Sequence, residues 1–194
     1  TNPSSDEKSE YILKKMMLPI QHRGPDAESL YINNKIALGH YRLSIIDING
    51  GQQPCIDKVN NNYLVFNGEI YGYKEHAKLL KSYGINLKNE SDTEVLFQSL
   101  IYLGVEKTLE MIDGMFAFVF YEGKNDTLWL IRDRMGEKPL YYSLHQNQIY
   151  FSSEASGIAA SDAYKSKTID TDALLQYLHL DYIPNNKSLL KGIE

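Results

Sequence analysis

Apolar and polar positions along the chain follow two rhythms, one typical of helices and one typical of strands. Between Tyr11 and Leu18 the apolar residues recur at helical spacing, and the polar residues 4–6 can cap the first turn. From Ser29 to Asp47 the pattern changes to short extended runs separated by polar pairs that suit turns. We therefore predict a helix first and then a piece of sheet.

The middle of the chain predicts a strand, a tight turn and then helices. Residues 63–66 are apolar and run into Asn67-Gly68, a pair that by itself is most often a hairpin turn. Residues 74–83 alternate in the helical manner. Residues 91–94 read Ser-Asp-Thr-Glu, in which serine and glutamate have the spacing of a capping box, so a second helix should begin there and a short third one should follow.

The second half of the chain predicts two hairpins and a last helix. Residues 115–131 hold two apolar runs around a polar turn, and we expect a hairpin that is buried on both faces. Residues 140–151 suggest a second hairpin, and residues 171–180 suggest a helix. Segregated strands and helices favour an α+β layered fold over a doubly wound parallel sheet.

Charge and composition narrow the classes of function. The chain has 20 Lys and Arg against 25 Asp and Glu, a net charge of −5, and its basic residues are scattered. We therefore expect small-molecule chemistry, with no nucleic acid and no membrane as partner. No apolar run approaches the roughly 20 residues that span a bilayer, and the polar start does not resemble a signal peptide, so we expect a cytoplasmic protein. Cys55 is the only cysteine, which excludes an internal disulfide.

Common catalytic motifs are missing from the sequence, and the candidate site rests on a few polar residues. The sequence contains no Gly-rich phosphate loop, no Cys or His pair with metal-ligand spacing and no GxSxG segment. What remains are Arg42, Asn67-Gly68-Glu69 and Asp92, which stand at expected strand ends and turns. Singly, these would be a structural cation, a hairpin turn and a helix-start residue. Their value depends on the segments around them.

Those segments form a collinear series. In chain order they are HRGPD (22–26), GHYRLSIID (39–47), GQQP (51–54), FNGEIY (66–71), SDTE (91–94), GMFAF (114–118), RDR with Gly136, and KPLYY (138–142). The series resembles the glutaminase domain of asparagine synthetase and its relatives, the class II or N-terminal-nucleophile glutamine amidotransferases. The sugar-phosphate and purine-pathway branches have other residues at HRGPD and RLSIID, so the asparagine-synthetase branch fits better. The resemblance implies a four-layer α-β-β-α sandwich of the N-terminal-nucleophile hydrolase type.

The resemblance also implies how glutamine would be held and cleaved. When a thiolate attacks the side-chain amide, the developing oxyanion would receive hydrogen bonds from the Asn67 side chain and the Gly68 backbone N–H. A guanidinium fork suits a carboxylate, so Arg42 would bind the α-carboxylate of glutamine. The remaining implied contacts are the backbone of Leu43, Ser44, Ile45 and Ile46 along the pocket, Glu69 in its wall, and Asp92 beside the α-ammonium group.

The nucleophile of this family is an N-terminal cysteine whose own α-amino group acts as the base, whereas the first residue here is Thr1. Thr1 is followed by residues typical of a turn and a helix cap rather than a strand, so it is a poor candidate. Cys55 lies in mid-chain and has no free amine, which leaves a buried or incidental thiol as its role. We expect that a short strand of about five residues, bearing the cysteine, precedes Thr1.

Other segments of the resemblance have structural roles. The residues of HRGPD would shape a loop near the pocket rather than transfer protons, and Arg132-Asp133-Arg134 with Lys138-Pro139 would organise a salt-bridged turn. We place the amidotransferase domain at residues 1–160. Residues 161–194 would be a linker and the truncated start of a synthetase domain, which is the expected partner in the same chain.

Three functions stay open at this stage. The first is a glutaminase whose parent protein makes asparagine from aspartate, ATP and glutamine, with no cofactor in this domain and with ATP and Mg²⁺ in the synthetase domain. The second supplies ammonia to another acceptor, such as a sugar. The third is an inactive glutamine-binding module. A homodimer is left open.

Overall fold

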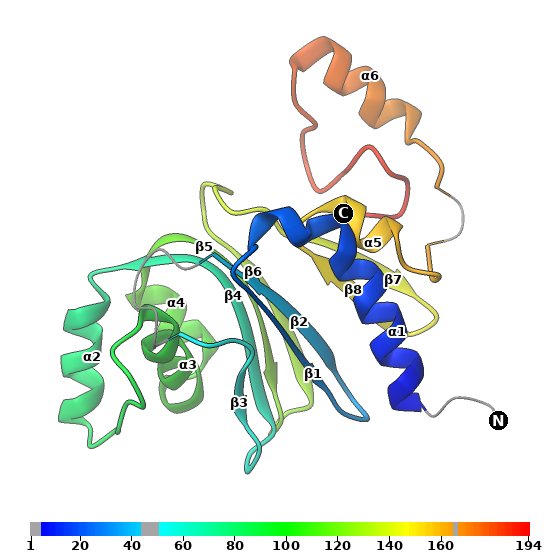
Figure 1. The fold of residues 1–194 in the computed structure, drawn as a ribbon. Helices are drawn as coiled ribbons and strands as arrows, with labels where there is room; N and C mark the ends of the chain where they lie inside the picture. The colour runs from blue at the N-terminus through cyan, green and yellow to red at the C-terminus, as the bar shows by residue number, and fades with distance from the viewer. Residues whose placement is uncertain (1–4, 44–50, 165–166) are drawn as a thin grey trace.

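The computed structural model describes residues 5–43, 51–164 and 167–194, which are arranged in four layers of helix, sheet, sheet and helix (Figure 1). One outer layer of helices covers a four-stranded antiparallel sheet of order β3-β4-β5-β6. The helices of this layer are α2 (Tyr73–Ser82), α3 (Asp92–Leu103) and α4 (Val105–Met111), and the strands are β3 (Cys55–Asp57), β4 (Asn62–Tyr71), β5 (Asp113–Glu122) and β6 (Thr127–Arg132).

The other half of the sandwich consists of two separate antiparallel hairpins with helices outside them. Helix α1 packs on the first hairpin and α5 on the second, while the last helix, α6, stands away from the layers. The elements of this half are α1 (Ser5–Met17), the 3₁₀ helix η1 (Leu18–Arg23), β1 (Ala27–Ile32), β2 (Ala37–Arg42), β7 (Tyr141–His145), β8 (Gln148–Ser152), α5 (Ala155–Ala159) and α6 (Thr171–Leu180).

Most elements expected from the sequence are present, and the four-layer α+β fold is confirmed. The predicted helix over 171–180 has those bounds in the structure. At α3, Ser91 accepts a hydrogen bond from Glu94 N–H at 3.1 Å, as a capping residue should. Glu94 does not complete the box, because its Oε1 accepts from Lys88 N–H at 3.1 Å and from Gln98 Nε2 at 2.9 Å. The Ser91 N–H donates to Asn89 Oδ1 at 2.9 Å instead.

The expectation of a tight turn at Asn67-Gly68 is wrong. Both residues lie inside β4, which continues to Tyr71 and pairs with β5 from Tyr63 to Tyr71, Asn67 opposite Ala117. A two-residue hairpin would bring β4 back on itself, but the apolar strand β5 provides a longer partner from elsewhere in the chain. The hairpin of β5 and β6 is also less buried than predicted, because the side chains of β6 are only partly covered.

The main core lies between the four-stranded sheet and its helices. The side chains that form it come from alternate positions of β4 and β5 and from one face of α3. The apolar face of the sheet therefore packs against the apolar face of the helix. Its fully buried members include Leu64, Ile70, Leu96, Phe97, Phe118 and Phe120. This packing holds β4 rigidly against α3, and β4 carries three of the predicted site residues.

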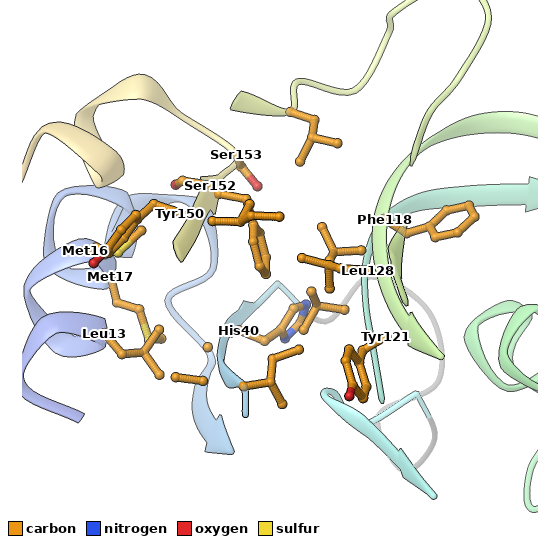
Figure 2. Close-up of a pocket in the computed structure, with 18 of the residues that line it drawn as sticks. Leu13, Met16, Met17, His40, Phe118, Tyr121, Leu128, Tyr150, Ser152 and Ser153 are labelled. Carbon is orange, nitrogen blue, oxygen red and sulfur yellow. The ribbon is translucent and has the colours of Figure 1, made fainter. Parts of the chain in front are cut away.

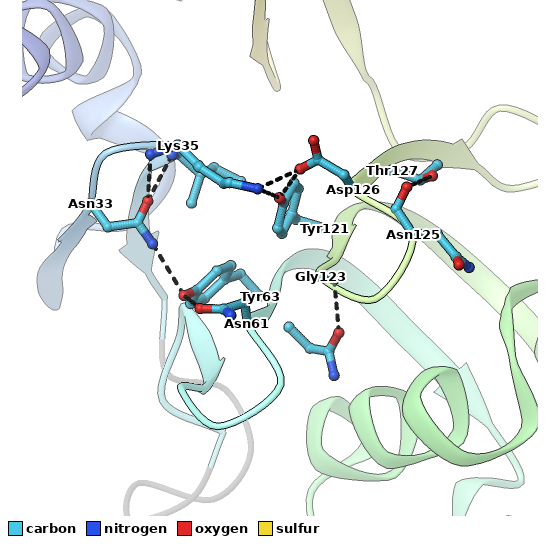
Figure 3. Close-up of polar contacts among 11 residues, drawn as sticks. Asn33, Lys35, Asn61, Tyr63, Tyr121, Gly123, Asn125, Asp126 and Thr127 are labelled. Atoms are coloured by element: carbon cyan, nitrogen blue, oxygen red, sulfur yellow. Dashed lines mark hydrogen bonds and ion pairs between the residues drawn. The ribbon is translucent and has the colours of Figure 1, made fainter.

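A polar cluster joins the two β layers at one end of the sandwich (Figure 3). Lys35, in the turn between β1 and β2, forms an ion pair with Asp126 at 2.8 Å and donates to Tyr121 at 3.2 Å. Next to it the rings of Tyr63 and Tyr121 stack with centroids 5.9 Å apart, and Asn33 donates to the Tyr63 hydroxyl at 3.1 Å. β2 and β4 both begin at this cluster, so Arg42, at the end of β2, and Asn67, in the middle of β4, lie further along their strands and away from it.

The turn after β6 is organised by one buried carboxylate and not by salt bridges, which corrects the sequence prediction. Asp133 is 6% exposed and accepts hydrogen bonds from four backbone N–H groups. Arg132 donates to the carbonyl oxygens of Gly136 and Lys138 at 2.5 and 2.8 Å. In the described part of the chain this turn contains no ion pair. Backbone N–H groups, and not cationic side chains, bind this carboxylate because the loop folds around Asp133 and directs the loop's N–H groups inward.

The last residues return to the sandwich. Tyr142 and Glu194 exchange two backbone hydrogen bonds, of 2.7 and 2.9 Å, and Ile193 is buried with Met16 and Ile158. The boundary at residue 160 stays a prediction. Within the described residues no helix is both long and apolar enough to cross a membrane.

Candidate active site

Strand β2 presents Arg42 to the space between the two β layers. Its side chains alternate between the faces, and Leu38 packs inward against Tyr63 and Tyr121 of the other sheet. Gly39 faces outward, where a Cβ would meet Met17 Sδ at 2.2 Å. Arg42 is an even number of residues from Leu38, so it shares the inner face, at the end of β2 far from the polar cluster.

Strand β4 presents Asn67 to the same space. Phe66 and Ile70 point into the helix-covered core, so Val65, Asn67 and Glu69 face the opposite way. The Nδ2 atom of Asn67 is buried and has no hydrogen-bond partner in the described part of the chain. Buried amide donors are nearly always paired. An unpaired Nδ2 at the edge of a cavity therefore indicates a position where it could donate a hydrogen bond to a ligand oxygen.

The N–H of Gly68 points to the edge of β4 that faces away from β5. Alternate residues of an antiparallel strand direct their N–H groups to the same side. On that side, Phe66 N–H donates to Gln53 Oε1 at 2.6 Å, and Ile70 N–H donates to Asp92 Oδ2 at 3.2 Å. Gly68 lies between these two residues, so its N–H points to the same edge.

The residue opposite Gly68 leads to the same conclusion. Phe116 uses its own backbone groups on Asp133: its N–H donates to Asp133 Oδ2 at 3.2 Å and its carbonyl oxygen accepts from Asp133 N–H at 2.7 Å. Gly68 and Phe116 are therefore a close, non-hydrogen-bonded pair. A Cβ on Gly68 would meet Met115 O at 2.1 Å, and φ is +149°, so only glycine fits here.

The edge of β4 thus carries two site residues predicted from the sequence and one that the sequence did not single out. Asp92 occupies the edge at Ile70 by accepting a hydrogen bond from the Ile70 N–H, and its other oxygen accepts from Thr93 N–H at 2.7 Å. Gln53 closes the edge at Phe66, where its Nε2 also donates to the carbonyl oxygen at 2.8 Å. In the sequence Gln53 is only one residue of the GQQP segment, and its role as a substitute for a neighbouring strand has no signal in the local sequence.

A cavity of about 490 Å³ lies between the β layers (Figure 2). Asn67 is one of the residues that line it. The cavity is bounded by α1 on one side and the four-stranded sheet on the other, with β2 and β8 at its flanks. Most of its walls are apolar, including Leu13, Met16, Val65, Val119, Leu128 and Tyr150. Strands β2 and β8 are not paired with each other, so the cavity separates two strand edges within one layer.

His40 lines this cavity on the face of β2 that also bears Arg42. Burial, and secondarily the positive charge of Arg42, lowers the pKa of His40 to about 4. The imidazole is therefore neutral at physiological pH. His40 is not among the site residues predicted from the sequence, although its two-residue spacing from Arg42 in an alternating strand is a usable signal.

The other predicted site residues are distributed as follows. Glu69 is half-buried on the inner side of β4, beyond Asn67. Leu43 follows β2 directly and is 53% exposed. Ser44, Ile45 and Ile46 lie outside the described residues, so the predicted backbone wall of the pocket stays a prediction.

The HRGPD segment is fixed by one carboxylate near the start of α5. Glu154 Oε1 binds His22 Nε2 at 2.9 Å and Arg23 at 3.2 Å. Burial opposes ionisation of Glu154, but the hydrogen bonds from Arg23 and Ser156 and the neighbouring His22 together lower its pKa. His22 and Arg23 thus hold η1 against α5, as a loop-shaping role requires. Among the described residues no group of three His, Cys, Asp or Glu side chains could hold a metal ion.

Cys55 is unsuited to act as a nucleophile. It lies in β3 and packs against the main core, and burial, followed by the Glu94 carboxylate, raises the pKa of its thiol to about 12. The thiolate, which is the reactive form, is therefore scarce at neutral pH. It is also absent from the residues that line the cavity at Asn67.

Replacing Cys55 with serine should therefore leave ammonia release from glutamine by the natural full-length polypeptide within about twofold of the unmodified rate, since a spectator thiol takes no part in covalent catalysis. Steady-state kinetics at pH 7.5 measure this. An inactive but folded Cys55→Ser protein would show that this thiol is the nucleophile after all.

Two solved structures share the architecture. Glutamine phosphoribosylpyrophosphate amidotransferase from B. subtilis superposes with a TM-score of 0.63 at 19% identity, over 77% of this chain and 40% of that one. A structure described as the allosteric regulatory enzyme of purine biosynthesis gives a TM-score of 0.53 at 22% identity, over 64% of this chain and 29% of that one. The fold is thus that of the N-terminal-nucleophile amidotransferases.

Sequence comparisons identify the family within that fold. A family model described as "Glutamine amidotransferase domain" matches residues 2–194. Asparagine synthetase [glutamine-hydrolyzing] 1 of Bacillus subtilis is 36% identical over 93% of this chain and 28% of its own length. Asparagine synthetase B of Escherichia coli is 36% identical over 72% of this chain and 25% of its own length. The chain belongs to the glutamine amidotransferase domain family and spans under a third of the length of these two relatives.

Proposed function

We propose that this domain hydrolyses glutamine to glutamate and ammonia, with Asn67 Nδ2 and the Gly68 N–H as the oxyanion hole. The observation that carries the proposal is the buried, unpartnered Nδ2 of Asn67 next to Gly68, whose N–H points to the edge of β4 away from β5. Both donors are fixed by the pairing of β4 with β5, so they are oriented before the substrate arrives. Preorganised donors of this kind stabilise the charge that develops on the amide oxygen.

Glutamine would lie along the edge of β4. Successive strand residues rise about 3.4 Å, so the N–H groups of Gly68 and Ile70 are about 7 Å apart, a distance that one glutamine molecule can bridge. The Asp92 carboxylate at Ile70 would attract the α-ammonium group, while Glu69 forms part of the wall. Arg42, on the inner face of β2, would bind the α-carboxylate with its planar guanidinium.

The nucleophile would reach Asn67 on a strand that occupies the cavity between β2 and β8. Both flanks are strand edges, and the floor and roof are apolar side chains of the sheet and of α1, which is the environment of a strand buried on both faces. A cysteine at the end of such a strand would lie beside the orphaned amide. Its α-amino group would take the thiol proton, ammonia would leave, and water would resolve the thioester.

Ammonia would serve the synthesis of asparagine from aspartate and ATP in a further domain of the same polypeptide, where ATP and Mg²⁺ would bind. The names of the asparagine synthetase relatives support this acceptor. An acceptor other than aspartate is the second candidate. One observation favours it: a relative named amidase chry2, from Gibberella zeae, is 36% identical over 73% of this chain. Product analysis of the full-length polypeptide with [¹⁵N-amide]glutamine would separate the two, because the label appears in asparagine only in the first case.

Replacing Arg42 with alanine tests the substrate site. Hydrogen bonds to a charged group contribute about 1.5–3 kcal/mol, so KM for glutamine should rise by about 10- to 150-fold, with a smaller change in kcat. Arg42→Lys, which keeps the charge but not the fork, should give an intermediate KM. Steady-state ammonia release by the full-length polypeptide provides the measurement, and an unchanged KM in Arg42→Ala would remove Arg42 from the site.

A further inference from the structure

Exposed apolar side chains concentrate on α6 and its flanks. Of the 18 large apolar residues that are exposed in the described part of the chain, seven lie between Ile169 and Leu189. On the helix itself Leu175 is 64% exposed and Leu178 71%, and Tyr182 just beyond it is 60% exposed. Leu175 and Leu178 have the i, i+3 spacing of one helical face, and Tyr182 follows the end of the helix; we call these three residues the α6 surface.

Helix α6 gains little from its own domain. Ala173 is its only buried residue, and the Oε1 atom of Gln176 is buried without a hydrogen-bond partner in the described part of the chain. An isolated helix of this length is marginal in water, since most helical stability comes from burying an apolar face. Figure 1 shows α6 standing apart from the four layers, so none of them covers that face.

The position of α6 is nevertheless fixed by its two ends. Asp170 caps the helix by accepting from Ala173 N–H at 3.0 Å, and its own N–H donates to Leu189 O at 2.9 Å. Lys191 N–H donates to Thr168 O at 3.0 Å, so the chain closes on itself below the helix. Hydrogen bonds thus join the two ends of the segment that contains α6, and the segment holds its apolar face outward. This arrangement is typical of a docking element and not of a loose tail.

We propose that the α6 surface docks onto a further domain of the same polypeptide. Curated relatives match this chain over 93% of its length yet are about three times as long, since the match covers 28% and 38% of their lengths, so a polypeptide of that length has room for a further domain that covers this face. The polar residues Asp172, His179 and Asp181 flank the face and leave its centre apolar, as at the core of a specific interface. This inference rests on the proposed function only in identifying that domain as the consumer of ammonia.

Hydrogen exchange of the α6 amides tests the docking. In the natural full-length polypeptide the amides of α6 should exchange at least about tenfold more slowly than in residues 1–194 alone, because docking suppresses local opening. The double substitution Leu175→Asp and Leu178→Asp should abolish this protection. Val59→Asp, which changes an 88% exposed apolar residue in the turn between β3 and β4, should retain it.

Three results would overturn the proposal: equal exchange in the full-length chain and in residues 1–194, protection that survives the double substitution, or protection that rises with protein concentration. The last would assign the surface to a second copy of the chain. Failure of the proposed function looks different, because it is an absence of ammonia release in a protein whose α6 is still protected. If both ideas hold, the double variant still hydrolyses glutamine but transfers less of the nitrogen to its acceptor.

Discussion

Asn67→Ala is expected to lower kcat for ammonia release from glutamine by about 10²- to 10³-fold, the usual effect of removing one oxyanion-hole donor. KM should change much less, because the interaction strengthens only as the amide oxygen becomes charged. Stability should hardly suffer. Nδ2 makes no hydrogen bond in the described structure, so its removal leaves no protein group unsatisfied and should cost less than about 1 kcal/mol.

The combination of a large kinetic effect and a small stability effect distinguishes this role from a structural one. Steady-state kinetics and urea unfolding of the full-length polypeptide measure the two quantities. Asn125→Ala, in the exposed turn between β5 and β6, is the matched control and should change neither. If kcat of Asn67→Ala stays within threefold of the unmodified enzyme, Asn67 is not an oxyanion donor.

Asp133→Asn should lower the free energy of unfolding by about 2–4 kcal/mol, since buried N–H groups that lose their acceptor carry their full desolvation cost. Oδ1 accepts from Met135 and Glu137, and Oδ2 accepts from Phe116 and Lys138. An asparagine can serve only one of these pairs and turns an NH₂ group toward the other. Urea unfolding at pH 7 measures the loss, and Asp181→Asn, an exposed helix-end residue at φ +60° that asparagine also tolerates, is the control.

The same carboxylate predicts a pH dependence. Burial alone would raise the pKa of Asp133, but the N–H groups of Lys138, Glu137, Phe116 and Met135 lower it below its ordinary value. The stabilisation is therefore complete above the unfolded-state pKa of about 3.9 and is lost as pH falls through the lower folded-state pKa. Asp133→Asn should lack this part of the acid transition. An acid-unfolding curve with the same slope in both proteins would contradict the assignment.

The sequence determined the order and type of most elements, because helical and strand periodicity are local properties of the chain. Residues 171–180 show this best, since their spacing alone gives the bounds of α6. The sequence also determined the family, because eight short segments occur in the expected order over residues 22–142. Arg42, Asn67, Gly68 and Asp92 could be proposed from those segments without any structure.

Only the tertiary structure decided what these residues face. Asn67-Gly68 looks like a turn until β5, some 50 positions away, pairs with it and turns Asn67 toward a cavity. The same long-range register leaves Asn67 Nδ2 unpaired and points the Gly68 N–H away from β5. It also places the Phe66 and Ile70 N–H groups where Gln53 and Asp92 accept from them. The organisation of Asp133 and the outward face of α6 likewise depend on which groups the fold covers. A local pattern specifies the conformation of a segment, but burial and hydrogen-bond partners are set by segments far away in the chain.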